Sequence, residues 1–201
     1  MTYPDFFDTI PAIELSDPLS AVLGTFVKGD VDISYLDVVK GAGHSCPTVG
    51  GAYLMTYHAL KALFPEGRAN RGGISVKLAD DLEEGTTGVV ANVISYITGA
   101  TDKSGFKGLA GNFARHSLMA YNQDVQNIRF TRVDTGESVD VIYDPSGIPP
   151  SPEQGPLIQA ILQGQASDEQ KQKFGQLWQD RVKRILVDNF ESDTVIKIVK
   201  I

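Results

Sequence analysis

Cysteine is almost absent from this chain, because Cys46 is the only one in 201 residues. A single cysteine excludes an intramolecular disulfide, so the fold must be held together by its core. With 201 residues and 42% hydrophobic side chains, the chain is long enough to bury such a core. The lack of a disulfide fits a reducing compartment, and we therefore expect a cytoplasmic protein.

Positive charge is also scarce. The chain has 18 Lys and Arg residues against 25 Asp and Glu residues, which gives a net charge of −7. Proteins that bind polyanions usually carry dense basic tracts. Here the basic residues near the C-terminus are few and interspersed with apolar ones: Arg181, Lys183, Arg184, Lys197 and Lys200. We interpret them as solvated faces and expect no nucleic-acid partner.

Long apolar runs are missing as well. A helix that spans a bilayer needs roughly 20 predominantly apolar residues, and no segment approaches that length. The first residues, Met-Thr-Tyr-Pro-Asp-Phe-Phe-Asp, lack the basic and apolar regions of a secretory signal. We therefore expect a soluble protein with no membrane partner.

Several common catalytic signatures do not occur. The chain contains no GxSxG, HExxH or CxxC pattern. The glycine-rich stretch 105–111 departs from both the GxGxxG spacing and the phosphate-loop spacing. None of these signatures therefore indicates a reaction.

Periodicity and turn residues predict both helices and strands. Segments with helical spacing of apolar residues lie at 18–26, 48–64, 87–97, 157–162 and 167–186. Segments with strand character lie at 33–40, 74–78, 115–121 and 195–201, and a β-hairpin is expected over 127–143. A Ser167–Gln170 capping box predicts the start of the last helix. The small residues Gly50, Gly51 and Ala52 indicate that another element approaches the helix over 48–64 closely.

One stretch combines the rarest chemical groups of the chain. Gly43-His44-Ser45-Cys46-Pro47 places an imidazole two residues from the only thiol, just before the helix expected over 48–64. In an extended segment such residues can point to one side and reach the same borderline metal ion. The helix dipole also favours a thiolate here, which would make Cys46 a nucleophile. A buried thiol beside a hydrogen-bonded histidine is the third interpretation, and spacing alone leaves all three open.

The order of motifs resembles a known family. Gly43-His44-Ser45-Cys46-Pro47 followed by Gly50 is similar to the GHxCP…G motif of the FmdE-like family, which takes its name from an association with formylmethanofuran dehydrogenase. The segment Val93-Ile-Ser-Tyr-Ile-Thr-Gly-Ala-Thr101 is similar to the family's helix that ends in an ITGCT-type turn. The resemblance covers roughly residues 15–145. It implies an α+β domain, a homodimer, and zinc or another transition metal near the His/Cys motif, but no dehydrogenase activity.

The chain departs from the family at three positions. Ala100 stands where the family's turn usually has cysteine, the usual helical cysteine falls near Val89, and an aspartate falls near Asn92. A bound metal would therefore have a depleted, open coordination sphere. His116 is the first candidate to complete it, because the resemblance places its segment near residues 98–101. Asn92 would then hydrogen-bond to a metal ligand.

With the expected elements, the resemblance predicts an α+β fold. Helices would pack on a mixed or antiparallel sheet, and a C-terminal helical segment would follow. We expect an FmdE-like domain at 1–146 and a Pro- and Gly-rich linker at 147–152. Residues 153–201 would form a helical extension with a terminal strand.

These residues support three functional hypotheses. The leading one is a protein that binds zinc or another transition metal, and with it a small-molecule ligand, through His44, Cys46 and His116. The second is an enzyme in which Cys46 is the nucleophile and His44 or His116 is the base. The third is a dimeric interaction or assembly module in which the His/Cys site is a remnant.

Overall fold

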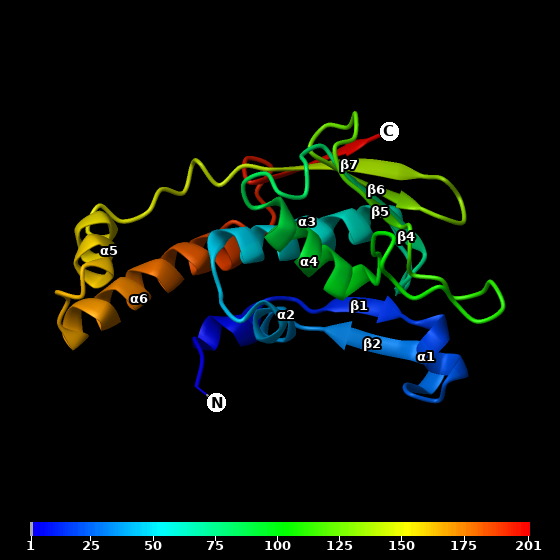
Figure 1. Cartoon of the computed structure of the whole chain (residues 1–201), viewed down its shortest axis with the longest axis horizontal. Coiled ribbons are helices and arrows are strands. Elements are labelled where there is room, and N and C mark those ends of the chain that lie inside the picture. The colour runs from blue at the N-terminus through cyan, green and yellow to red at the C-terminus, as the bar shows by residue number, and fades with distance from the viewer. Residues whose placement is uncertain (1) are drawn as a thin grey trace.

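The computed structural model describes residues 2–201 and has an α+β fold (Figure 1). The helices are α1 (Pro18–Val22), α2 (Tyr35–Ala42), α3 (Pro47–Leu63), α4 (Thr87–Thr98), α5 (Gln154–Leu162) and α6 (Asp168–Lys183). The strands are β1 (Ile13–Ser16), β2 (Asp30–Ile33), β3 (Ala69–Asn70), β4 (Ile74–Leu78), β5 (Met119–Ala120), β6 (Ile128–Arg132), β7 (Ser138–Tyr143) and β8 (Ile196–Lys200). Short 3-10 turns cover Asp5–Thr9 and Val27–Gly29, and a π-helical turn covers Arg184–Asp188.

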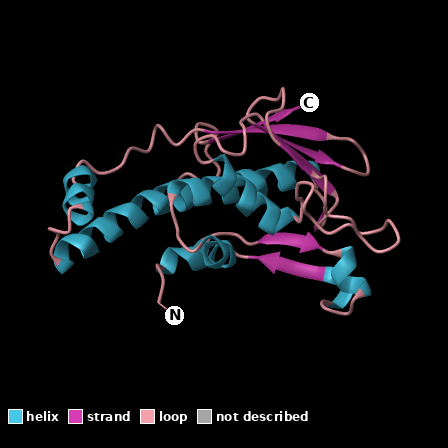
Figure 2. Ribbon diagram, in the orientation of Figure 1, coloured by secondary structure: helices cyan, strands magenta, loops and turns pink. Residues whose placement is uncertain are grey.

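The strands form two mixed sheets with helices between them (Figure 2). The smaller sheet has the order β2-β1-β3, and the larger has the order β5-β4-β6-β7-β8. In the larger sheet β4 and β5 are parallel, whereas the other neighbours are antiparallel. The predicted α+β fold with helices packed on a mixed sheet and a C-terminal helical segment is confirmed, although the strands divide into two sheets.

Helix α3 is the central helix of the core. It contacts α2, α4 and three strands of the larger sheet, and most of its residues are buried. This explains why its sequence is apolar on nearly every side. A Cβ atom at Gly50 would come 3.1 Å from Cδ1 of Leu186, and one at Gly51 would overlap the ring of Tyr143. The close approach expected at these small residues is confirmed.

The predicted strand over 33–40 is wrong. Strand β2 ends at Ile33, and helix α2 begins at Tyr35. The Ser34 hydroxyl accepts a hydrogen bond from the Asp37 N–H (3.2 Å), while the Asp37 carboxylate accepts one from the Ser34 N–H (3.0 Å). This capping box starts a helix despite the β-branched and aromatic residues that follow.

Other predicted elements agree with the structure to different degrees. The strand over 74–78, the hairpin of β6 and β7, and the capping box of Ser167 and Gln170 are confirmed. Of the predicted segments 18–26 and 115–121, only the parts in α1 and β5 are regular. The terminal strand β8 pairs antiparallel with β7 of the same chain, so it belongs to the larger sheet.

A buried ion cluster joins three segments that are distant in the sequence. Asp17 caps α1 by accepting the N–H of Ser20 (3.2 Å). Its carboxylate also accepts hydrogen bonds from Arg71 (3.0 Å) and Arg115 (2.7 Å). Arg71 donates in addition to two carbonyl oxygens in the last turn of α4. The cluster therefore fixes the positions of the C-terminal ends of β1, β3 and α4 relative to one another.

None of the helices within residues 2–201 combines the length and the apolar character that crossing a bilayer requires.

Candidate functional site

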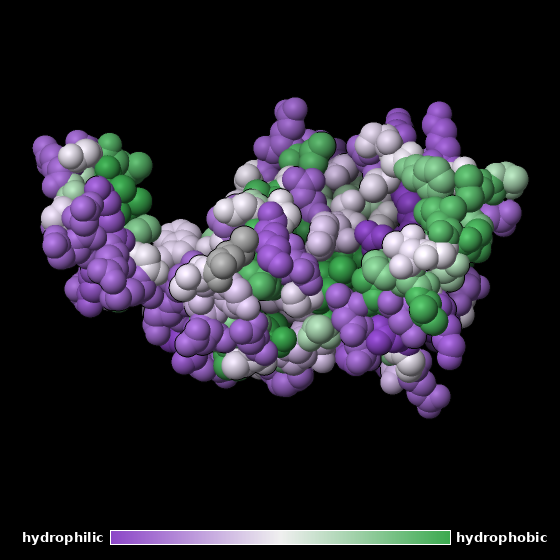
Figure 3. All heavy atoms as spheres, turned by 90° about the horizontal axis from the view of Figure 1, so that it is seen from below, coloured by the Kyte–Doolittle hydropathy of each residue, from purple (hydrophilic) through white to green (hydrophobic). Residues whose placement is uncertain are grey.

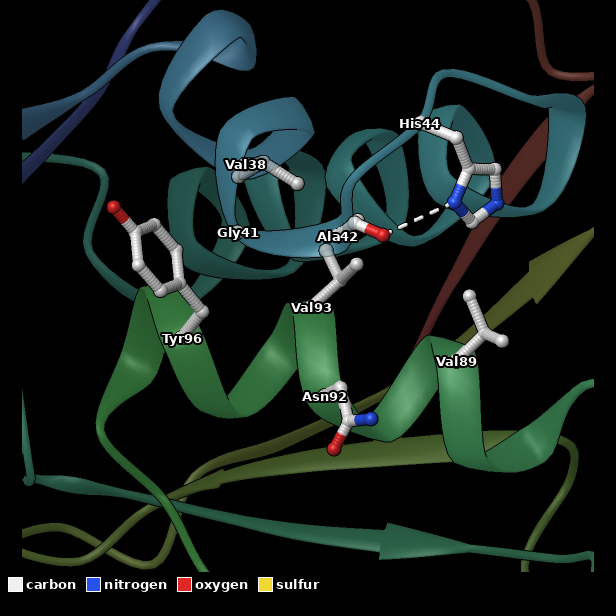
Figure 4. A pocket seen from close by; sticks show the side chains of 8 residues that line it. All are labelled: Val38, Gly41, Ala42, His44, Val89, Asn92, Val93 and Tyr96. Atoms are coloured by element: carbon white, nitrogen blue, oxygen red, sulfur yellow. Dashed lines mark hydrogen bonds between the residues drawn. The ribbon is translucent and has the colours of Figure 1, made fainter.

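A surface cleft between α2 and α4 lies beside the His/Cys stretch. It has a volume of about 240 Å³ and is lined by Val38, Gly41, Ala42, His44, Val89, Asn92, Val93 and Tyr96. Spacings of three and four residues place the lining side chains of each helix on one face of that helix. Figure 4 shows the rings of His44 and Tyr96 at opposite ends of the cleft.

His44 enters the cleft because α2 ends just before it. Gly43 adopts a left-handed conformation (φ 77°) and terminates the helix, as glycine does at many helix ends. The exposed ring of His44 then folds back, with Nδ1 3.1 Å from the carbonyl oxygen of Ala42 (Figure 4). A carbonyl can only accept, so Nδ1 donates this hydrogen bond, and in the Nδ1–H tautomer Nε2 offers a lone pair.

Cys46 has a different position. It is the N-cap of α3, and its sulfur accepts a hydrogen bond from the N–H of Val49 (3.4 Å). The residue is 8% exposed and is not among those that line the cleft. Pro47 follows at the first position of the helix, where a missing N–H costs nothing. Helix capping therefore accounts for the Cys-Pro pair without a ligand.

Ser45 is held by helix α6. Its carbonyl oxygen accepts hydrogen bonds from the indole N–H of Trp178 (3.0 Å) and from the amide of Gln179 (3.1 Å). Its hydroxyl lies 2.9 Å from the hydroxyl of Tyr35. Burial raises the pKa of Tyr35 well above its ordinary value, so this hydroxyl stays neutral. The His/Cys stretch, residues 43–47, is thus fixed to the C-terminal part of α6.

His116 is not among the residues that line the cleft. It lies in the loop before β5. Its backbone N–H donates to the carbonyl oxygen of Phe106 (3.2 Å), and its ring Nδ1 lies 3.0 Å from the Ser117 hydroxyl. Throughout residues 2–201, no three His, Cys, Asp or Glu side chains gather closely enough to hold a metal ion.

The residues present therefore do not fit a metal centre built by one chain. Zinc takes four ligands in structural sites and at least three protein ligands in most catalytic ones. His44 offers one free ring nitrogen, Cys46 uses its sulfur as a helix cap, and His116 joins no such group. Zinc or another transition metal bound by His44, Cys46 and His116 stays a prediction that this geometry does not support.

Val89 and Asn92, at which the sequence differs from the family motif, line the cleft together with His44. The third such residue, Ala100, is fully buried beyond the end of α4. An isopropyl group and an amide therefore stand where the resemblance places a thiol and a carboxylate. The cleft lacks the anionic ligands that a cationic metal prefers, and its lining is largely apolar.

Sequence reasoning missed the α2 side of the cleft and Tyr96. Tyr96 is an aromatic residue that is 42% exposed at the end of α4, with its ring against Gly41. The signal was a large aromatic on the same helical face as Asn92, four residues away. The α2 side is absent from the prediction because the composition of residues 33–40 favours a strand.

Comparisons with known proteins found no match, either to a protein-family model or to a curated protein. The resemblance to the FmdE-like family therefore rests on its motifs and stays a proposal.

Proposed function

We propose that this chain binds a small, largely apolar organic molecule in the cleft between α2 and α4. One observation carries the proposal: His44 is the residue of the motif that packing does not explain. Among its neighbours, Gly43 ends α2, Ser45 bonds to α6 and Cys46 caps α3. The ring of His44, in contrast, is exposed and sits at one end of a cleft.

The size of the cleft limits the ligand. Its volume of about 240 Å³ is below the range of roughly 300–1,000 Å³ that is common for drug-sized ligands. A fused bicyclic ring or a single substituted ring is therefore the expected size. Tyr96 supplies a flat ring against which an aromatic ligand can stack.

The chemistry of the lining residues favours a neutral ligand. None of the eight lining residues is Lys or Arg, and the chain has a net charge of −7, so an anion gains no attraction. Val38, Val89 and Val93 form an apolar wall. The Asn92 amide can donate and accept, and Nε2 of His44 can accept. These groups fit a heteroaromatic molecule that donates an N–H to His44 and, where it has an acceptor, accepts from Asn92.

Replacing His44 with alanine should weaken the binding of such a molecule. We expect indole, benzimidazole or nicotinamide, each of which carries an N–H donor, to show saturation transfer from the wild-type protein in ligand-observed NMR. A neutral hydrogen bond contributes about 0.5–1.5 kcal/mol, so His44→Ala should raise the dissociation constant up to about tenfold. Asn92→Trp, at an exposed position, should fill the cleft and abolish binding.

His116→Ala is the matched control, because it removes a histidine outside the cleft, and it should leave binding unchanged. The proposal fails if none of the three probes binds the wild-type protein. It also fails if binding survives Asn92→Trp.

A further inference from the structure

A second cavity lies against a different face of α4, near the start of that helix. It has a volume of about 360 Å³ and is enclosed by α3, the start of α4 and the ends of β4, β6 and β7. Thr87 and Val90 of α4 line this cavity, whereas Val89, Asn92 and Val93 of the same helix line the cleft beside His44. The two hollows are therefore separate, and the second is within the size range of common ligand sites.

Buried apolar residues form the floor of this cavity. Met55, Leu78 and Ile128 line it although each is at most 5% exposed. Apolar atoms also gather at the end of the molecule opposite α5 (Figure 3), where residues 22–27 near α1 include side chains that are 43–86% exposed. The cavity differs from that exposed patch because its apolar residues are recessed, so they can surround a small molecule.

The rim of the cavity is acidic. Asp80 and Glu84 line it, and none of its lining residues is Lys or Arg. None of the ion pairs within residues 2–201 involves either carboxylate. Their negative charges therefore have no partner in the described chain and attract a cation.

Thr87 adds a buried hydroxyl without a partner. The residue is 7% exposed and lines the cavity, and no side-chain hydrogen bond within residues 2–201 involves its hydroxyl. The buried hydroxyls of Thr56 and Thr98 donate instead to the carbonyl oxygen four residues earlier in their helices (2.7 and 2.8 Å). Thr87 is the first residue of α4, so no preceding helical turn offers such a carbonyl. Buried polar groups are normally hydrogen-bonded, and a partner for this hydroxyl fits in the cavity.

We propose that this cavity binds a small organic ammonium ion. Its apolar part would lie on the floor, and its N–H groups would donate to Asp80, Glu84 and the Thr87 hydroxyl. An ammonium group has three donors and no acceptor, which matches two carboxylates and a hydroxyl.

Other ligands fit this cavity less well. No three His, Cys, Asp or Glu side chains within residues 2–201 gather closely enough to hold a metal ion, and the apolar floor offers a metal no ligand. An anion would be repelled by the acidic rim. The proposal does not depend on which molecule the cleft beside His44 binds.

Titration of the full chain with phenethylammonium in ligand-observed NMR tests the proposal. The matched neutral probe is 2-phenylethanol, which has the same ring and the same two-carbon chain. We expect phenethylammonium to bind the wild-type protein and 2-phenylethanol to bind about tenfold more weakly, because it lacks the charge that the rim attracts.

Variants of the rim test which residues bind the ammonium group. Asp80→Asn/Glu84→Gln neutralises both carboxylates with little change of shape, so it should raise the dissociation constant about tenfold. Asp81→Asn/Glu83→Gln is the matched control, because it removes the same charge from exposed residues of the same segment that do not line the cavity. It should change the constant less than about twofold. Thr87→Val keeps the shape of the side chain but removes the hydroxyl, and should raise the constant about threefold.

Four results would overturn the proposal. The first is a wild-type protein that does not bind phenethylammonium, and the second is equal binding of 2-phenylethanol. The third is an equal effect of the two charge variants, which would indicate a diffuse acidic field instead of a site. The fourth is loss of phenethylammonium binding in Asn92→Trp, which would place the amine in the cleft. Absence of indole binding in the cleft would change none of these readouts.

Discussion

Replacing Asp17 with alanine is expected to cost about 3–5 kcal/mol of the free energy of unfolding, because it breaks a buried ion cluster. Asp17 is 4% exposed, and Arg115 is 8% exposed. Nη1 of Arg115 already lacks a hydrogen-bond partner among the described residues. Without the carboxylate, two guanidinium groups would face each other with no counter-charge, and the cap of α1 would be lost as well.

Urea unfolding at neutral pH measures this loss. Asp32→Ala is the matched control, because Asp32 pairs with Arg68 on the same small sheet but its side chain is 55% exposed. Exposed ion pairs contribute little, so the control should lose less than about 1 kcal/mol. A loss at Asp17 as small as that at Asp32 would show that the cluster does not stabilise the fold.

The same cluster predicts a dependence of stability on pH. Burial opposes ionisation of Asp17, but hydrogen bonds from Arg71 and the Ser20 N–H, with the charges of Arg115 and Arg71, outweigh it and lower the pKa of the carboxyl. A lowered pKa in the folded state contributes stability above the unfolded value of about 3.9, and that stability is lost as the pH falls through the folded pKa. The difference in unfolding free energy between wild type and Asp17→Ala should therefore shrink in acid. A difference that is constant from neutral pH to pH about 2 would contradict this.

Replacing Gly51 with alanine should cost about 1–3 kcal/mol, because the new methyl group would overlap the ring of Tyr143. That ring cannot move freely, since its hydroxyl donates to the carbonyl oxygen of Pro47 (2.9 Å) at the start of α3. Burial raises the pKa of Tyr143 well above its ordinary value, so the hydroxyl remains a neutral donor. Thermal unfolding followed by circular dichroism would measure the loss.

Gly175→Ala provides the control for Gly51→Ala. Gly175 lies within α6, and beyond its chain neighbours and the adjacent helix backbone no atom lies within 4 Å of the place that a methyl group would take there. Alanine at this position should therefore stabilise the helix by about 0.5–1 kcal/mol. If both variants gained stability, the expected overlap with Tyr143 would be absent and helix propensity alone would explain the effect at Gly51.

Local signals in the sequence predicted the elements whose structure is determined locally. Three such signals correspond to observed elements: the alternation of apolar and polar residues over 74–78, the Asp134-Thr-Gly136 turn of the hairpin and the Ser167–Gln170 capping box. The strand predicted after Ser34 is wrong, because its β-branched residues favour a strand whereas an equally local capping box starts a helix there. The prediction therefore lacks α2, which forms one wall of the cleft.

The remaining features depend on contacts between distant residues. Asp17 meets partners 54 and 98 residues away, and Ser45 meets Trp178 133 residues away. Periodicity and spacing carry no trace of such pairs. The motif predicts a site within residues 43–51, but whether His44 and Cys46 share a site depends on tertiary structure. The structure places His44 in the cleft and Cys46 at the N-cap of α3.

The most direct measurement compares Cys46→Ser with His44→Ala, using NMR with indole as probe and metal analysis of the same tag-free samples. Serine caps helices well, so Cys46→Ser should keep the fold and bind indole as the wild type does. His44→Ala should bind it more weakly, and the metal content should be the same in both variants and the wild type. Equal loss of indole binding, or of a bound metal, in the two variants would contradict the account, because it would place Cys46 in one site with His44.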